Sequence, residues 1–340
     1  MKKYIAFIAS STIILSGCAL EDTSRITDGE ANGLTSIEEV SLEIDPVGYE
    51  IAPAFETDWP TSFDRDELVS SSLNKMFDSF DARKPKFDES KIDVYIDPRI
   101  PEQHHGWITE LSEHTILMMS SEIDEKVSLI VGANAHFMHE MVDENNLDMP
   151  MVDNFGQNLR PCDYGWGACS GGNTMYVGSS LRGLSILDRS PQFARMLSHK
   201  SLHVVQDHVD HASGGQTPPR SMENFRPVWF VEGFAEFYAY ALNDYLELHP
   251  YHKSQNRWFE YASLRDLEEW NSEKSEDKYL WGQVAIEYIV ANAGFEALVH
   301  LYRLLEEGQT FEDAFRNSIG ISLGEFYEAF DEWAVSQYSE

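Results

Sequence analysis

Basic residues are scarce in this sequence. Lysine and arginine together number 25 against 58 aspartates and glutamates, which gives a formal net charge of −33. A field of this sign repels nucleic acid and anionic lipid head groups, so we expect no nucleic-acid partner. The acidic residues are spread along the whole chain, a pattern typical of a solvated acidic surface rather than of an acidic tail.

The apolar stretch at the start of the chain is too short to span a membrane. It runs from Tyr4 to Ile14, follows Lys2 and Lys3, and falls short of the roughly 20 residues that a membrane helix needs. A positive start followed by a short apolar stretch is typical of an export signal. The sequence therefore predicts export, with a signal peptide over residues 1–17.

The end of this signal resembles the lipobox of bacterial lipoproteins. Leu15, Ser16 and Gly17 place small residues directly before Cys18. The resemblance implies cleavage before Cys18 and acylation of this cysteine, which would anchor the protein to a lipid membrane of the cell envelope. Ala19 follows in place of the aspartate that usually retains such proteins in the inner membrane, so an outer membrane is favoured. An ordinary signal peptide with a chance cysteine is the alternative.

Cysteine is also rare, with only Cys162 and Cys169 besides Cys18. An exported chain meets an oxidising compartment, where two closely spaced cysteines tend to pair. We therefore predict a disulfide between Cys162 and Cys169. A metal knuckle fits poorly, because the spacing is wider than CxxC and no second pair exists.

The chain divides into regions of different pattern. Residues 18–62 are acidic, carry prolines and lack periodicity, which predicts a disordered tether. Residues 63–184 predict a mixed α/β region, and residues 185–340 are helical almost throughout. The expected fold class is α+β: a small mixed sheet with covering helices, then a mostly helical part. The expected elements in the first region are a helix from about Asp64, strands at 92–96, 127–131 and 174–177, and helices at 107–119 and 133–142.

Two histidines and a glutamate suggest a metal site. His199 and His203 are one helical turn apart and share a helix face, so both imidazoles could bind one zinc ion. A lone HxxxH pair is weak evidence, because such histidines are more often surface or core residues. Glu232 lies among apolar residues in the next helix, and a buried carboxylate is costly unless paired or bound to metal. A third ligand of this kind leaves the fourth zinc position for water.

These segments resemble the peptidase MA-like gluzincins, a family of zinc peptidases. The segment 197–206 resembles the family's HExxHxxQ helix, 229–237 its WxxEGxAE[FY] helix, and 279–282 its YxxG helix. The segment 294–298 resembles the start of the family's next helix, and the segments 307–315 and 320–326 resemble its closing pair. The similarity covers roughly residues 185–333. The resemblance implies a zincin-like helical subdomain.

The resemblance also implies roles for single residues. The metal ligands would be His199, His203 and Glu232, with Zn²⁺ as the cofactor. Glu236 would accept a hydrogen bond from a ligand histidine, or be a helix-surface carboxylate. Tyr279 would face the oxyanion, or be a packing aromatic. Two more histidines, expected on a loop, are not predicted as ligands: His208 and His211.

Lys200 departs from the family pattern. The family has glutamate there, which accepts a proton from zinc-bound water. An ammonium has no lone pair for this and repels a metal dication. Three interpretations stay open: the site is inactive, a neutral Lys200 is the base, or Glu236 or Asp207 substitutes.

The function expected from these residues is that of an envelope-anchored pseudopeptidase that binds a peptide or protein without cutting it. An active metallopeptidase with a substitute base is the first alternative. A metal-free structural protein of the envelope is the second.

Overall fold

The structure is a computed structural model of the chain. It describes residues 59, 63–86, 88–119, 125–149, 151–153, 159–161, 168–178, 180–181, 184–185, 191–212, 226–251, 262–268 and 277–338. The predicted signal peptide, Cys18, Cys162 and nearly all of the predicted tether lie outside these residues. Trp59, within the range predicted as tether, is buried and contacts the rings of Tyr288 and Phe326.

A mixed sheet forms one layer of the described chain. Its order is β1-β2-β6-β5-β3-β4, with β1 (Ile92–Ile96), β2 (Val127–Gly132) and β6 (Thr174–Gly178) parallel. The antiparallel half consists of β5 (Ala168–Gly171), β3 (Met151–Asp153) and β4 (Leu159–Pro161). A separate pair joins β7 (Ser180–Leu181) to β8 (Leu184–Ser185).

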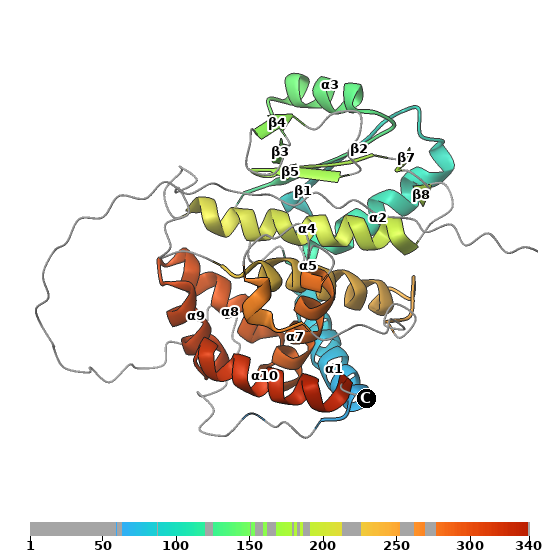
Figure 1. Cartoon of the computed structure of the whole chain (residues 1–340). Helices are drawn as coiled ribbons and strands as arrows, with labels where there is room; N and C mark the ends of the chain where they lie inside the picture. Colours follow the sequence, from blue (N-terminus) through green and yellow to red (C-terminus); the bar gives the residue numbers. More distant parts are fainter. Residues whose placement is uncertain are drawn as a thin grey trace, which may run out of the picture.

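Helices cover both faces of this sheet. α3 (Ala135–Asn145) lies on one face, and α2 (His105–Leu117) and α4 (Pro191–Ala212) lie on the other (Figure 1). Every residue of β2 is buried, because a strand between two helical layers has no solvated side. The predicted strands 92–96, 127–131 and 174–177 and the predicted helices over α2 and α3 are confirmed within a few residues. The α+β fold class is thereby confirmed at the level of a mixed sheet with helices.

The remaining helices form a second body on the far side of α4 (Figure 1). They are α5 (Val228–Tyr245), α7 (Asp277–Ala293), α8 (Phe295–Glu306), α9 (Phe311–Ile319) and α10 (Leu323–Tyr338). α5 is apolar on nearly every side and buried from Val228 to Asn243, apart from two half-buried positions, as a central helix must be. The first helix of the chain, α1 (Arg65–Arg83), also packs here: Arg83 pairs with Glu296 at 2.7 Å.

α7 and α8 are separated by a sharp bend of 103°. The break falls at Gly294, whose φ of 86° is in the left-handed region that favours glycine. Among the described residues, no single helix is long and apolar enough to cross a membrane. Together, α7 and α8 have the length and apolar composition of a membrane span, but the bend separates them.

α5 and α7 meet backbone to backbone at two glycines. A Cβ on Gly233 would lie 2.2 Å from the carbonyl carbon of Gly282, and a Cβ on Gly282 would lie 2.2 Å from the carbonyl oxygen of Trp229. No side chain fits at this crossing, so the glycines set how closely the two helices approach. The crossing brings the first turn of α7 beside Glu232, the neighbour of Gly233.

Replacing Gly282 with alanine should lower the free energy of unfolding by about 2–3 kcal/mol, because the methyl group forces the two helices apart. Chemical denaturation of the wild type and of Gly282→Ala measures this. Gly106→Ala is the matched control: nothing lies within 4 Å of its Cβ position in α2. There the stability should stay constant or rise by up to about 1 kcal/mol. Equal stability of the two variants would show that the helices do not touch at Gly282.

Candidate metal centre

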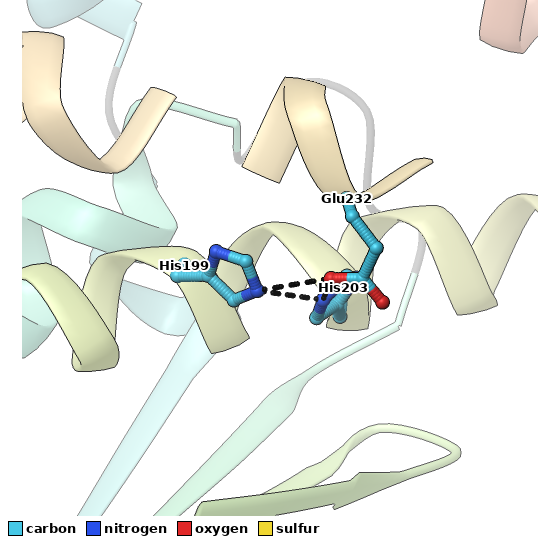
Figure 2. Close-up of side chains that lie close together, drawn as sticks. All are labelled: His199, His203 and Glu232. Carbon is cyan, nitrogen blue, oxygen red and sulfur yellow. Dashed lines mark hydrogen bonds and ion pairs between the residues drawn. The ribbon is translucent and has the colours of Figure 1, made fainter. Parts of the chain in front are cut away.

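Three side chains from two helices converge inside the protein. His199 and His203 project from one face of α4, and Glu232 reaches them from α5, as Figure 2 shows. The Nε2 atoms of the two imidazoles lie 3.0 Å apart. The Oε2 atom of Glu232 lies 3.3 Å from each of them. His199 and Glu232 are buried, and His203 is largely so.

The triangle formed by these atoms fits a metal ion. Ligands held about 2.0–2.1 Å from a tetrahedral ion lie about 3.3 Å from one another, close to the 3.0 and 3.3 Å found between the three atoms. The Oε2 atom of Glu232 is buried and takes part in no hydrogen bond among the described residues. A bound cation would give this carboxylate oxygen the partner that burial demands. The donor set of two imidazoles and one carboxylate suits zinc among other transition metals.

The opposite nitrogen of each imidazole is fixed by a hydrogen bond. Nδ1 of His199 donates to Oε2 of Glu236 at 3.0 Å, and Nδ1 of His203 donates to Oε1 of Gln206 at 2.7 Å. Each acceptor is itself held, Glu236 by Arg195 at 2.7 Å and Gln206 by its donation to the carbonyl of Val231 at 3.1 Å. Such contacts orient metal-binding histidines and select the tautomer with a free Nε2 lone pair.

This hydrogen-bond pattern favours a metal ion or added protons at the centre. If both Nδ1 atoms carry hydrogen, two Nε2 lone pairs and an ionised carboxylate oxygen face one another within 3.3 Å. Repulsion among three electron-rich atoms is relieved by a metal ion or by protons on the rings. Burial lowers the pKa of His203, which favours its neutral, metal-binding form.

Both glutamates of the centre stay ionised despite burial. Burial alone would raise the pKa of Glu232, but the charge and hydrogen bonds of His203 and His199, when these rings carry the extra proton, outweigh burial and hold that pKa well below its ordinary value. For Glu236, burial is likewise opposed by Arg195 and His199, and its pKa is lowered. Glu236 is therefore an acceptor that holds His199 from the side away from Nε2, and it is not placed to take a proton from a water on the metal.

α7 contributes two residues to this region. The ring of Tyr279 lies with its centroid 6.0 Å from that of His199, so the tyrosine predicted for the site does approach it. Its neighbour Lys278 is only 1 % exposed and interacts electrostatically with Glu232. Burial lowers the pKa of Lys278 to about 8, and Glu232 partly opposes this shift.

Three side chains around the centre had no role assigned from the sequence: Arg195, Gln206, which was included only as the last residue of the HExxHxxQ-like segment, and Lys278. Helical spacing held a signal for the first two, because Arg195 lies four residues before His199 and Gln206 three residues after His203. No local signal marks Lys278, which is brought to Glu232 only by the crossing of α5 and α7.

For the other residues predicted for the site, the structure describes the side chain of Lys200 and only the helical backbone of Asp207, His208 and His211. Lys200 is half-buried on α4, and its charge acts on His203. His208 and His211 do not lie on a loop, because α4 continues to Ala212: the apolar pattern of the helix extends further than predicted. Their side chains and that of Asp207 lie outside the described residues. Cys169 is disulfide-bonded. Its predicted partner, Cys162, does not belong to the residues that the structure describes.

Comparison with known proteins found no similar protein. No family model matches the chain, and no match was found among curated proteins or solved structures.

Glu236→Gln should weaken zinc binding by about 10–100-fold, because the neutral amide no longer supports His199 and Arg195 loses its counter-ion. Competition with a chromogenic chelator measures the zinc Kd. Glu328→Gln, at an exposed position on α10, is the matched control and should leave the Kd unchanged. A Kd within about twofold of the wild type in Glu236→Gln would mean that His199 is not a ligand held by this carboxylate.

Lys278 should make stability depend on alkaline pH. Its pKa of about 8 in the folded protein lies below the ordinary 10.5, so between these values the unfolded chain binds more protons and stability rises with pH. The free energy of unfolding of the wild type relative to Lys278→Met, measured with chelator present, should increase from pH 8 to pH 10. Buried tyrosines such as Tyr176, with a pKa raised by burial to about 12, affect both proteins alike. Parallel pH profiles would contradict the assignment.

Proposed function

We propose that this protein is an envelope-anchored, zinc-binding relative of the gluzincin peptidases that recognises a peptide or protein without hydrolysing it. The observation that carries the proposal is the buried triangle of His199, His203 and Glu232, with both histidines held by further residues, directly beside Lys200. The order of the motifs along the chain supports the kinship. The short apolar stretch after two lysines and the lipobox-like residues before Cys18 support the anchoring.

His199, His203 and Glu232 would hold the zinc ion. Zinc supplies Lewis acidity toward a carbonyl oxygen and an open coordination position. Hydrolysis further needs a carboxylate that accepts a proton from water. Lys200 occupies that sequence position, and Glu236 is committed to His199 and Arg195. This set of described side chains supports binding without cleavage.

A peptide ligand would meet a tyrosine and two lysines around the metal. Tyr279 approaches His199 from α7, where a hydroxyl donor could face a carbonyl oxygen of the ligand. Lys200 acts electrostatically on His203, and Lys278 interacts electrostatically with Glu232. Among the described side chains, the centre thus retains groups that bind and polarise a carbonyl but has no carboxylate free to act as the base of hydrolysis.

Zinc content, thermal unfolding and peptide cleavage test this function together. The purified full chain should retain zinc, lose thermal stability on chelation, and cleave no peptide in a mixed library. Lys200→Glu should bind zinc at least about tenfold more tightly, because a carboxylate replaces a cation near the dication. Lys86→Glu, an exposed lysine outside the site, provides the same charge change as a control.

Each alternative has its own outcome. Chelator-sensitive cleavage by the wild type would replace the proposal with an active peptidase. Absence of zinc, with no rise in melting temperature when zinc is added, would leave a metal-free structural protein. Unchanged zinc affinity in Lys200→Glu would mean that Lys200 points away from the metal.

A further inference from the structure

We propose that Arg195 is a positioning residue of the metal centre, which acts through Glu236 to hold the imidazole of His199 in its metal-binding orientation. The inference rests on the proposed zinc-binding function and names a residue that sets the affinity of that site. Arg195 is not itself a metal ligand, because a guanidinium stays protonated and has no lone pair to offer a metal. Its effect on the metal must therefore pass through another side chain.

The side chains of α4 and α5 interlock as a ladder with the metal site in its lower half. The members on α4 are spaced four residues apart, and so are the two on α5, so each set shares one helix face. Contacts of 2.7, 3.0, 3.3 and 3.3 Å alternate between the helices and join, in order, Arg195, Glu236, His199, Glu232 and His203. Figure 2 shows the last three of these side chains. Arg195 thus forms the end of the ladder, two contacts away from the first ligand atom.

Glu236 joins Arg195 to His199 because each of its two oxygens makes one contact. Oε1 lies 2.7 Å from Nη2 of Arg195, and Oε2 accepts the hydrogen of Nδ1 of His199 at 3.0 Å. The two oxygens belong to one rigid carboxylate, so the contact at Oε1 fixes where Oε2 lies. The hydrogen bond to Nδ1 in turn directs Nε2 of the same ring toward Glu232.

Arg195 is itself held in place. Its guanidinium lies over the ring of Tyr240 on α5, 5.1 Å from the ring centroid, which is a cation–π contact. The side chain of Arg195 is 21 % exposed and that of Glu236 is 4 % exposed, so water and salt screen this ion pair little. Without the guanidinium, the buried carboxylate of Glu236 would lose a cation. A turn of that carboxylate toward another donor would then release Nδ1 of His199.

Zinc affinity of arginine variants in the full chain tests this role. Arg195→Met should weaken zinc binding by about tenfold or more, as loss of support for a ligand histidine does, measured by competition with a chromogenic chelator. Arg195→Lys keeps a cation beside Glu236 and should bind zinc within about threefold of the wild type. Arg83→Met is the matched control, because it removes another 2.7 Å ion pair between helices, the one from α1 to Glu296 of α8. It should lower thermal stability and leave the zinc Kd unchanged.

A double variant shows whether Arg195 acts through Glu236. Glu236→Gln alone already interrupts the path to His199, so Arg195→Met added to it should weaken zinc binding by less than about twofold further. Losses that add in full would mean that Arg195 reaches the centre by another route, which would overturn the inference. The visible absorption of bound Co²⁺ is a second measurement, because it reports the geometry of the ligands. It should change in Arg195→Met and stay as in the wild type in Arg195→Lys and Arg83→Met.

The outcomes separate this inference from the function on which it rests. A wild type that binds neither zinc nor Co²⁺ would overturn both. Zinc binding by the wild type, with a Kd within about twofold of it in Arg195→Met, would overturn the role of Arg195 and leave the metal site intact. Equal losses of zinc affinity in Arg195→Met and Arg83→Met would reduce the effect to general stability and overturn the positioning role. Should Arg195→Met not fold, Arg195→Gln, which also lacks the charge, replaces it in every comparison.

Discussion

The site depends on one electrostatic constraint: three electron-rich atoms face one another inside the protein. The Nε2 atoms of His199 and His203 and the Oε2 atom of Glu232 lie 3.0–3.3 Å apart, away from bulk water. Such an arrangement is unfavourable unless a cation joins them. The surrounding hydrogen bonds keep the two Nε2 atoms directed toward Glu232. Glu236 and Gln206 each accept the hydrogen of an Nδ1 atom, so the other nitrogen of each ring faces the centre. The fold therefore holds three potential metal-ligand atoms at distances that suit a bound cation.

The rest of the architecture serves to bring three helices to this point. α4 lies between the sheet and the helical body, so its two histidines face inward, and α5 supplies Glu232 from the centre of that body (Figure 1). α7 completes the arrangement, and it does so only because Gly233 and Gly282 permit backbone contact between α5 and α7. A side chain at either glycine would move Lys278 and Tyr279 away from the metal ligands. The backbone contact between α5 and α7 therefore also determines which side chains of α7 lie near the candidate metal ligands.

The sequence predicted the parts whose signals are local. The alternation in 92–96, the buried run in 127–131 and the one-turn spacing of His199 and His203 each depend on a few adjacent residues, and each was found where expected. The strands β3, β4 and β5 escaped prediction because three or four residues carry no periodicity to detect. Lys278 escaped for another reason: its burial results from the crossing of two helices, which no window along the chain contains. Prediction therefore gave the three residues of the candidate metal site together with Glu236 and Lys200, but not Arg195 or Lys278.

Those charges change what the centre can do. In a hydrolytic site, a carboxylate next to the first histidine would both accept a proton and offset the charge of the metal. Lys200 reverses that charge, and the buried Lys278 adds a second cation on the side of Glu232. The only other carboxylate that touches the ligand histidines, within the part of the chain that the structure describes, is Glu236, and Arg195 already neutralises it. Within the part of the chain that the structure describes, the site therefore offers no carboxylate beyond Glu232 that is free to accept a proton from water.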